Sequence, residues 1–131
     1  MADIRTVTPD FAVAPQLAPG DMAVAKARGF VLVINNRPDD EAPGQPTSAE
    51  MQAAAAAEGL GYVHIPVQGR PEAAQIRAVA ETVAAAQGPV LAFCRSGTRS
   101  IISWSLGQKD RPREELIRLG QAAGYDLSGV V

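Results

Sequence analysis

Residues 89–100 read PVLAFCRSGTRS and divide into a strand, a tight loop and the beginning of a helix. The apolar run from Pro89 to Phe93 predicts a strand buried on both faces, which is typical of parallel sheets. The single cysteine, Cys94, follows this strand directly, and a helical run from Ser100 to Gln108 follows the loop. Ligand sites of open α/β sheets lie at the carboxyl ends of the strands, so the chemistry of this chain is expected here.

The loop after Cys94 has the composition of an anion-binding cradle. Gly97 permits a backbone conformation that a tight turn requires, and the following helix directs the positive end of its dipole at the loop. Backbone N–H groups in such a loop surround an anion, and Arg99 adds a guanidinium that binds two oxygens at once. We therefore predict that phosphate-type anions bind to Arg95, Ser96, Gly97, Thr98 and Arg99.

Cys94 itself has two interpretations. Free cysteine is among the most buried residue types, so a lone cysteine is commonly an inert core residue. The helix dipole and Arg99 instead favour the nucleophilic thiolate over the thiol. A strand, the pattern C-x-x-G-x-R-S and a helix in succession favour catalysis or anion binding. In that interpretation Cys94 lies at the base of a shallow pocket, and Ser100 hydrogen-bonds the sulfur and helps it leave a covalent intermediate.

The flanking segments complete an α/β pattern. Alternating strands and helices joined by right-handed crossovers predict a central, mostly parallel sheet with helices on both faces. A capping box at Thr47–Glu50 marks the start of one of these helices. The other predicted elements are strands at residues 30–34 and 62–67, helices at 21–28, 48–58, 72–86 and 110–123, and a small antiparallel pair formed by 4–7 and 11–14 at the sheet edge.

The composition and charge of the chain limit the other classes of protein to which it could belong. The chain has 131 residues, with 12 basic and 14 acidic side chains, so its formal charge is 12 − 14 = −2, and 47% of its residues are hydrophobic. These values predict one soluble, cytoplasmic domain spanning residues 1–131 that binds neither nucleic acid nor membranes. One cysteine and one histidine do not supply a typical zinc site, so we expect no metal and no cofactor.

Short stretches spread along nearly the whole chain carry a resemblance to a known family. They are residues 11–16, 29–39, 64–67, 94–100 and 123–125. These stretches resemble the phosphatase-like domain of beta-lactamase-hydrolase-like proteins, a bacterial branch of the protein tyrosine and dual-specificity phosphatase superfamily. The resemblance implies a protein tyrosine phosphatase-like fold and a small phosphorylated substrate, hydrolysed through a Cys-phosphate intermediate. It implies that Cys94 attacks phosphorus, that the 95–99 amides and Arg99 hold the phosphoryl oxygens, and that Ser100 eases release.

Three features depart from the superfamily's pattern. The ordinary phosphatase loop has five residues between cysteine and arginine, whereas this loop has four, a feature that the bacterial branch shares. Phe93 stands where histidine usually precedes the nucleophile. The loop after the strand at 62–67 reads Gln68-Gly69-Arg70 where an aspartic general acid is expected. Because an amide does not deliver a proton, aryl esters with good leaving groups are the expected substrates.

A second loop, after the strand at 30–34, offers other polar residues to the same edge of the sheet. Asp39, Asp40 and Glu41 are candidates for an alternative acid, although a solvated acidic turn is the simpler interpretation. Asn36 and Arg37 are candidates for the pocket rim, or alternatively for capping the loop.

Two other functions stay open. The spacing of four residues between Cys94 and Arg99 also resembles the active loop of rhodanese-type sulfurtransferases, in which cysteine carries a persulfide. A domain that binds phosphorylated or other anionic ligands without catalysis is the third possibility. The flanking stretches favour the phosphatase-like interpretation over sulfur transfer, and the binding domain stays open.

Overall fold

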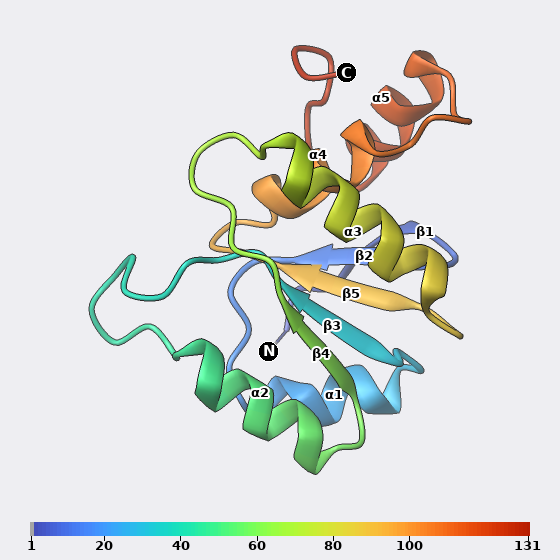
Figure 1. The fold of residues 1–131 in the computed structure, drawn as a ribbon. Helices are drawn as coiled ribbons and strands as arrows, with labels where there is room; N and C mark the ends of the chain where they lie inside the picture. Colours follow the sequence, from blue (N-terminus) through green and yellow to red (C-terminus); the bar gives the residue numbers. More distant parts are fainter. Residues whose placement is uncertain (1) are drawn as a thin grey trace.

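The computed structural model describes residues 2–131 and shows a five-stranded sheet between two layers of helices (Figure 1). The strands lie in the order β1-β2-β5-β3-β4; only β1 and β2 pair in antiparallel fashion. No helix within residues 2–131 is long and apolar enough to span a bilayer. The strands are β1 (Arg5–Thr8), β2 (Phe11–Ala14), β3 (Leu32–Asn35), β4 (Gly61–His64) and β5 (Val90–Phe93), and the helices are α1 (Asp21–Ala27), α2 (Ser48–Ala57), α3 (Ala73–Ala85), α4 (Thr98–Leu106) and α5 (Arg113–Ala122).

The central strand β5 is buried on both faces, as its unbroken apolar run predicts. Because side chains alternate along a strand, Val90 and Ala92 pack into the core beneath α3, α4 and α5, and Leu91 and Phe93 pack into the core beneath α1 and α2. Figure 1 shows these two helical layers on opposite faces of the sheet. The predicted α/β architecture is thus confirmed.

The N-terminal antiparallel pair is confirmed, but of its two strands only β1 lies at an edge of the sheet. The second strand, β2, is an inner strand that pairs in parallel with β5, from Phe11 opposite Val90 to Ala14 opposite Phe93. All four residues of β2 are buried, and the ring of Phe11 stacks on Trp104 of α4 with 5.2 Å between centroids. A strand that is apolar on both faces is more stable inside the sheet than at its edge.

Several element boundaries differ from those predicted, by one to three residues. The strand expected at 30–34 occupies Leu32–Asn35, and the strand expected at 62–67 ends at His64, shortly before Pro66, which has no backbone N–H to donate. The helix expected from Ser100 begins at Thr98, with Gly97 as its N-cap. This earlier start places Arg99 inside the first turn of α4.

The capping box at the start of α2 is present. Thr47 Oγ1 accepts a hydrogen bond from the Glu50 backbone N–H, and Glu50 Oε1 accepts one from the Thr47 backbone N–H, each over 3.1 Å. The alanine-rich α2 therefore begins at a fixed residue.

Replacing Thr47 by alanine removes the side-chain acceptor of this capping box. We expect Thr47→Ala to lower the free energy of unfolding by about 1 kcal/mol, as measured by urea denaturation. Thr47→Ser keeps the hydroxyl and is the matched control, with a stability near that of the wild type. Equal stability of Thr47→Ala and wild type would contradict a role for the cap.

Candidate active site at the carboxyl edge of the sheet

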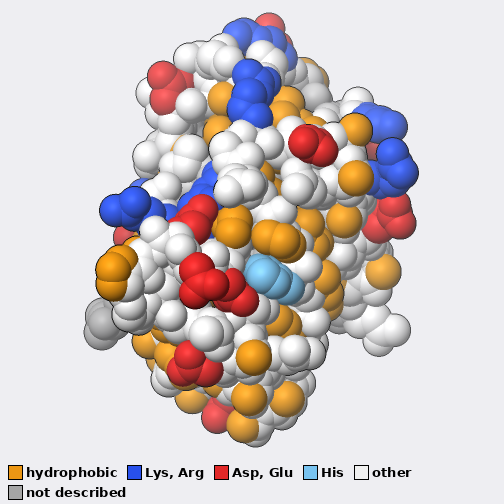
Figure 2. Space-filling view, turned by 60° about the vertical axis from the view of Figure 1, so that its left-hand side comes forward, with side chains coloured by type: hydrophobic (Ala, Val, Ile, Leu, Met, Phe, Trp, Pro, Cys, Tyr) orange, Lys and Arg blue, Asp and Glu red, His pale blue; other side chains and the backbone are white. Residues whose placement is uncertain are grey.

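Cys94 follows the central strand at the carboxyl edge of the sheet, and the neighbouring strands hold its loop from both sides. The Asn36 N–H, just after β3, donates to the Phe93 carbonyl over 2.8 Å. The Gln16 N–H, just after β2, donates to the Arg95 carbonyl over 3.2 Å. In the view of Figure 2, which brings this edge forward, acidic and basic side chains lie next to one another.

The loop turns back onto the sulfur at Gly97. Gly97 has a φ of 89°, a left-handed conformation that glycine adopts readily, and its N–H donates to Cys94 Sγ over 3.1 Å. A side chain at this position would also collide with the hydroxyl of Tyr125. The sulfur therefore accepts a hydrogen bond from the loop that follows it.

Cys94 is fully buried, with 0% of its surface exposed, and the shallow pocket expected above it stays a prediction. The loop that follows directs its own Gly97 N–H at the sulfur. Ser100 is equally buried, and its Oγ has no hydrogen-bond partner. The expected contact between Ser100 and the sulfur is thus absent from this structure.

Arg99 is held by its terminal nitrogens. Nη1 and Nη2 donate to the two carboxylate oxygens of Glu41 over 2.7 and 2.8 Å, and Nη1 also donates to the Val67 carbonyl over 2.8 Å. Both protons of Nη1 are thereby used. Nε–H and the second proton of Nη2 form the side-on edge of the guanidinium, which is not used by Glu41 or Val67. That edge has the geometry to bind two oxygens of an anion.

Glu41 lies between two arginines. Besides Arg99, it accepts a hydrogen bond from Arg37 Nε over 2.9 Å, and its side chain is 26% exposed. The hydrogen bond from Arg99 is the largest of the effects that lower the pKa of Glu41 to about 2. The same hydrogen bond, with a smaller contribution from nearby Cys94, raises the pKa of Arg99. Glu41 is therefore a carboxylate at neutral pH and has no proton to donate.

The other two acidic candidates lie in the same turn. Asp39 accepts a hydrogen bond from the Ser48 N–H over 2.8 Å at the start of α2, and Asp40 is exposed with a φ of 63°. This placement agrees with a solvated acidic turn. Of the three acidic residues, it is Glu41 that faces Arg99.

Asn36 and Arg37 are buried, so the expectation that they line the pocket rim is wrong. Their exposed fractions are 0% and 5%. The backbone continues the sheet here, since the Asn36 carbonyl accepts the Val67 N–H over 2.9 Å. The Arg37 side chain links Glu41 to Gln16, while Asn36 Oδ1, like Ser100 Oγ, is a buried polar atom without a partner.

The remaining loop residues Arg95, Ser96 and Thr98 are exposed. Ser96 Oγ donates to Thr98 Oγ1 over 2.9 Å and accepts the Thr98 N–H over 3.3 Å. Two of the five predicted anion-binding amides, those of Gly97 and Thr98, thus have partners inside the loop. An anion above the sulfur would have to share or replace these contacts.

Comparison with known proteins identifies the family. Residues 3–110 match the family model described as "Beta-lactamase hydrolase-like protein, phosphatase-like domain". The chain belongs to this family. It is 39% identical over 119 residues to the Agrobacterium fabrum beta-lactamase hydrolase-like protein, which covers 88% of this chain. The chain spans about a quarter, 28%, of the length of that relative.

Solved structures share the fold of this phosphatase-like domain. A candidate phosphatase from Neisseria meningitidis superposes with a TM-score of 0.86 at 31% identity, covering 96% of this chain and 92% of that one. A Cys→Ser variant of P. aeruginosa TpbA, solved in complex with phosphotyrosine, superposes with a TM-score of 0.65 at 15% identity, covering 98% and 87%. The predicted protein tyrosine phosphatase-like fold and family are confirmed.

Two residues of the site escaped sequence reasoning. The sequence predicts Glu41 as a candidate acid or as part of a solvated turn, and its pairing with Arg99 spans 58 positions of the chain. Tyr125, whose hydroxyl donates to the Ser96 carbonyl over 2.8 Å, received no role. The available signal for Tyr125 is its place in the stretch 123–125, which carries part of the family resemblance.

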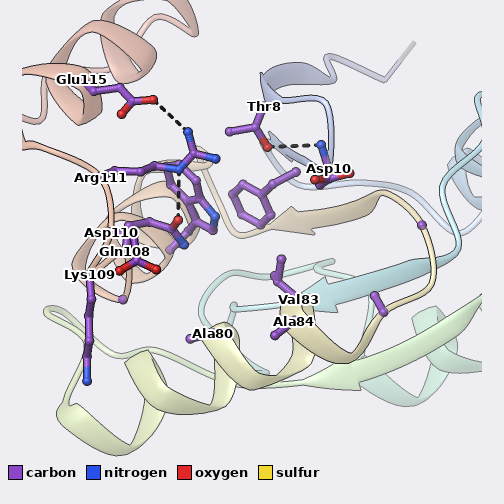
Figure 3. A pocket seen from close by; sticks show the side chains of 15 residues that line it. Thr8, Asp10, Ala80, Val83, Ala84, Gln108, Lys109, Asp110, Arg111 and Glu115 are labelled. Atoms are coloured by element: carbon purple, nitrogen blue, oxygen red, sulfur yellow. Dashed lines mark hydrogen bonds and ion pairs between the residues drawn. The ribbon is translucent and has the colours of Figure 1, made fainter.

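A groove of about 960 Å³ lies at the opposite, amino edge of the sheet (Figure 3). Phe11 and Trp104 line it together with the ends of α3 and α4, and Arg111 lies over Trp104 and pairs with Glu115. Cys94 and Arg99 do not line this groove. The groove is therefore separate from the candidate active site of the domain.

The depressed pKa of Glu41 predicts a pH-dependent contribution to stability. Replacement by glutamine removes the ionic contacts to Arg99 and Arg37. Because folding lowers the Glu41 pKa from 4.5 to about 2, this contribution is full above about pH 5 and is lost as pH falls through 2. We expect the difference in unfolding free energy between wild type and Glu41→Gln to shrink over that window in denaturant titrations.

The control for this experiment is Glu81→Gln, which removes an exposed carboxylate outside the four ion pairs found among residues 2–131. If the difference in unfolding free energy between wild type and Glu41→Gln stays constant from pH 7 to pH 2, the ion pairs of Glu41 do not stabilise the fold.

Proposed function

We propose that this domain is a cysteine-dependent phosphatase that hydrolyses aryl phosphate esters, with Cys94 as the nucleophile. The observation that carries the proposal is the hydrogen bond from the Gly97 N–H to Cys94 at the end of the central strand, with Arg99 nearby. Glu41 and the Val67 carbonyl leave the side-on edge of Arg99 unused. An N–H donor and a nearby guanidinium both favour the thiolate, the reactive form of cysteine.

The anion-binding parts are arranged around the same residues. Glu41 and the Val67 carbonyl hold the end-on side of the Arg99 guanidinium, so its orientation is fixed before a substrate arrives. Two phosphoryl oxygens then bind Nε–H and Nη2–H, and the amides of residues 95–99 and the N-terminus of α4 complete the cradle. In this proposal Glu41 is a positioning residue, because it acts through Arg99.

The reaction has two displacements. The Cys94 thiolate attacks phosphorus, an S–P bond forms, and the P–O bond to the aryl group breaks, with the aryl oxide taking a proton from water. A water molecule then attacks phosphorus, and the P–S bond breaks. This step releases inorganic phosphate, returns the thiolate and gives one proton to solvent. Ser100 Oγ, which has no partner, donates a hydrogen bond to the departing sulfur after rotation about its Cα–Cβ bond.

The proposed substrate preference depends on whether an acid can protonate the leaving oxygen of the ester. Glu41 is ionised, Asp39 binds the start of α2, and the loop after β4 carries Gln68, Gly69 and Arg70, which are exposed. Without a carboxylic acid to protonate the leaving oxygen, a leaving group must be stable as an anion. Phenolic oxygens meet this demand and alkyl oxygens do not, so the proposed substrates are small aryl phosphates such as phosphotyrosine.

Sulfur transfer is the second candidate, and the observation that favours it is the four-residue spacing between Cys94 and Arg99. Sulfur transfer needs room for only one extra sulfur on Cys94, a demand that a short loop meets more easily than the binding of three phosphoryl oxygens. The family match and the fold support the phosphatase instead.

One preparation assayed for nitrophenyl phosphate hydrolysis and for thiosulfate:cyanide sulfur transfer separates these functions. We expect phosphate release that is abolished in Cys94→Ser and reduced about 10² to 10³-fold in Arg99→Ala, with thiocyanate production near background. Arg118→Ala, which removes an exposed arginine of α5, is the matched control. Cys94-dependent thiocyanate production without phosphate release would overturn the phosphatase proposal. Silence in both assays, with anions that protect Cys94 from alkylation, would indicate a binding module.

The missing proton donor predicts a steep dependence on the leaving group. General-acid assistance is worth about 10² to 10⁴ in rate, so kcat/KM for phosphotyrosine should exceed that for phosphoserine by at least about 10². Phosphate release from the two amino acids under identical conditions measures the ratio. Comparable rates would show that an acid operates, and loss of phosphoserine turnover in Asp39→Asn or Asp40→Asn would then identify it.

A further inference from the structure

One peptide group of the loop is hydrogen-bonded at both ends. The Ser96 carbonyl accepts a hydrogen bond from the Tyr125 hydroxyl over 2.8 Å, and the Gly97 N–H of the same peptide group donates to Cys94 Sγ over 3.1 Å. In a planar trans peptide the carbonyl and the N–H point in opposite directions. Holding the carbonyl therefore aims the N–H at the sulfur.

Tyr125 is itself fixed by the end of α5. The Tyr125 N–H donates to the Gly120 carbonyl over 2.8 Å and the Gly124 N–H donates to the Gln121 carbonyl over 3.0 Å, which is the Schellman arrangement of a helix end. The Arg5 guanidinium lies 5.3 Å from the centre of the Tyr125 ring. The tyrosine thus reaches the loop from a segment anchored to both α5 and β1.

The loop and the tyrosine also fit one another closely. Gly97 provides the space for the hydroxyl, since a Cβ at this position would collide with it. Burial, the largest effect, raises the pKa of Tyr125, so the hydroxyl is protonated at neutral pH and donates to the carbonyl. A donor at the carbonyl polarises the peptide group and strengthens the N–H as a donor.

We propose that Tyr125 is a positioning residue for the nucleophile: its hydroxyl orients and polarises the Ser96–Gly97 peptide group so that the Gly97 N–H stabilises the Cys94 thiolate. The inference rests on the proposed role of Cys94 as the nucleophile. The charged and titratable groups near the sulfur are Arg99 from α4, which is paired with Glu41 from the loop after β3, and Tyr125 from the C-terminal segment. Tyr125→Phe removes the hydroxyl and leaves the Arg99–Glu41 ion pair in place.

The test measures the pH dependence of Cys94 alkylation by iodoacetamide in wild type and Tyr125→Phe. Cys94 is the single cysteine of the chain, so the label reports on one residue. We expect the midpoint of the rate profile to rise by about 0.5 to 1 pH unit in Tyr125→Phe, which corresponds to the net worth of one hydrogen bond. The acidic limb of the pH profile of kcat/KM for nitrophenyl phosphate should shift by the same amount. The ultraviolet absorbance of the thiolate gives a second measure of the midpoint, one that does not require a reagent to reach the sulfur.

Tyr62→Phe is the matched control, because its hydroxyl bonds to Asn35 and Ser48 and not to the loop. It should leave the midpoint unchanged, and denaturation of both variants shows whether they are folded. An unchanged midpoint in folded Tyr125→Phe would overturn the proposal even if the enzyme is a phosphatase. Because alkylation needs no turnover, a shifted midpoint would support it even if phosphatase activity were absent.

Discussion

The double burial of β5 is the constraint on which the rest of the site depends. Val90 to Phe93 is buried on both faces and hydrogen-bonded to β2 on one side and β3 on the other. Helices cover both faces of β5 and a strand pairs with each of its edges, so its last residue has a fixed position. The next residue, Cys94, therefore has little conformational freedom. The loop must then reverse direction within a few residues to begin α4 on one face of the sheet, and Gly97 provides the left-handed conformation for that turn.

Electrostatics tie three separate segments to this fixed point. Glu41, from the loop between β3 and α2, pairs with Arg99 in the first turn of α4 and with Arg37 at the end of β3. Two guanidinium groups around one carboxylate keep that carboxylate ionised and hold Arg99 by its end-on edge. The arrangement leaves Glu41 without a proton to donate, which is why the supply of a proton governs the proposed substrate preference.

The match to the family model includes part of this site. The family match covers residues 3–110 and therefore includes the strands, Cys94 and Arg99 but not Tyr125. The hydroxyl that holds the Ser96 carbonyl comes from beyond that range, at the end of α5. Cys94 and Arg99 thus lie within the family match, and the contact that aims the Gly97 N–H comes from the C-terminal segment that follows it.

The sequence alone determined the features that depend on neighbouring residues. The apolar run at 89–93, the capping box at Thr47 and the glycine at position 97 act through local backbone geometry, and each was predictable from a few consecutive residues. The tertiary structure decided the inner position of β2, the burial of Asn36 and Arg37, and the two contacts that complete the site. Glu41 pairs with Arg99 across 58 positions and Tyr125 reaches Ser96 across 29, and no local period or spacing records such distances. Glu41 and Arg99 meet because the parallel strands β3 and β5 bring their carboxyl ends, and the loops that follow them, to one edge of the sheet. Tyr125 reaches the same edge from the end of α5.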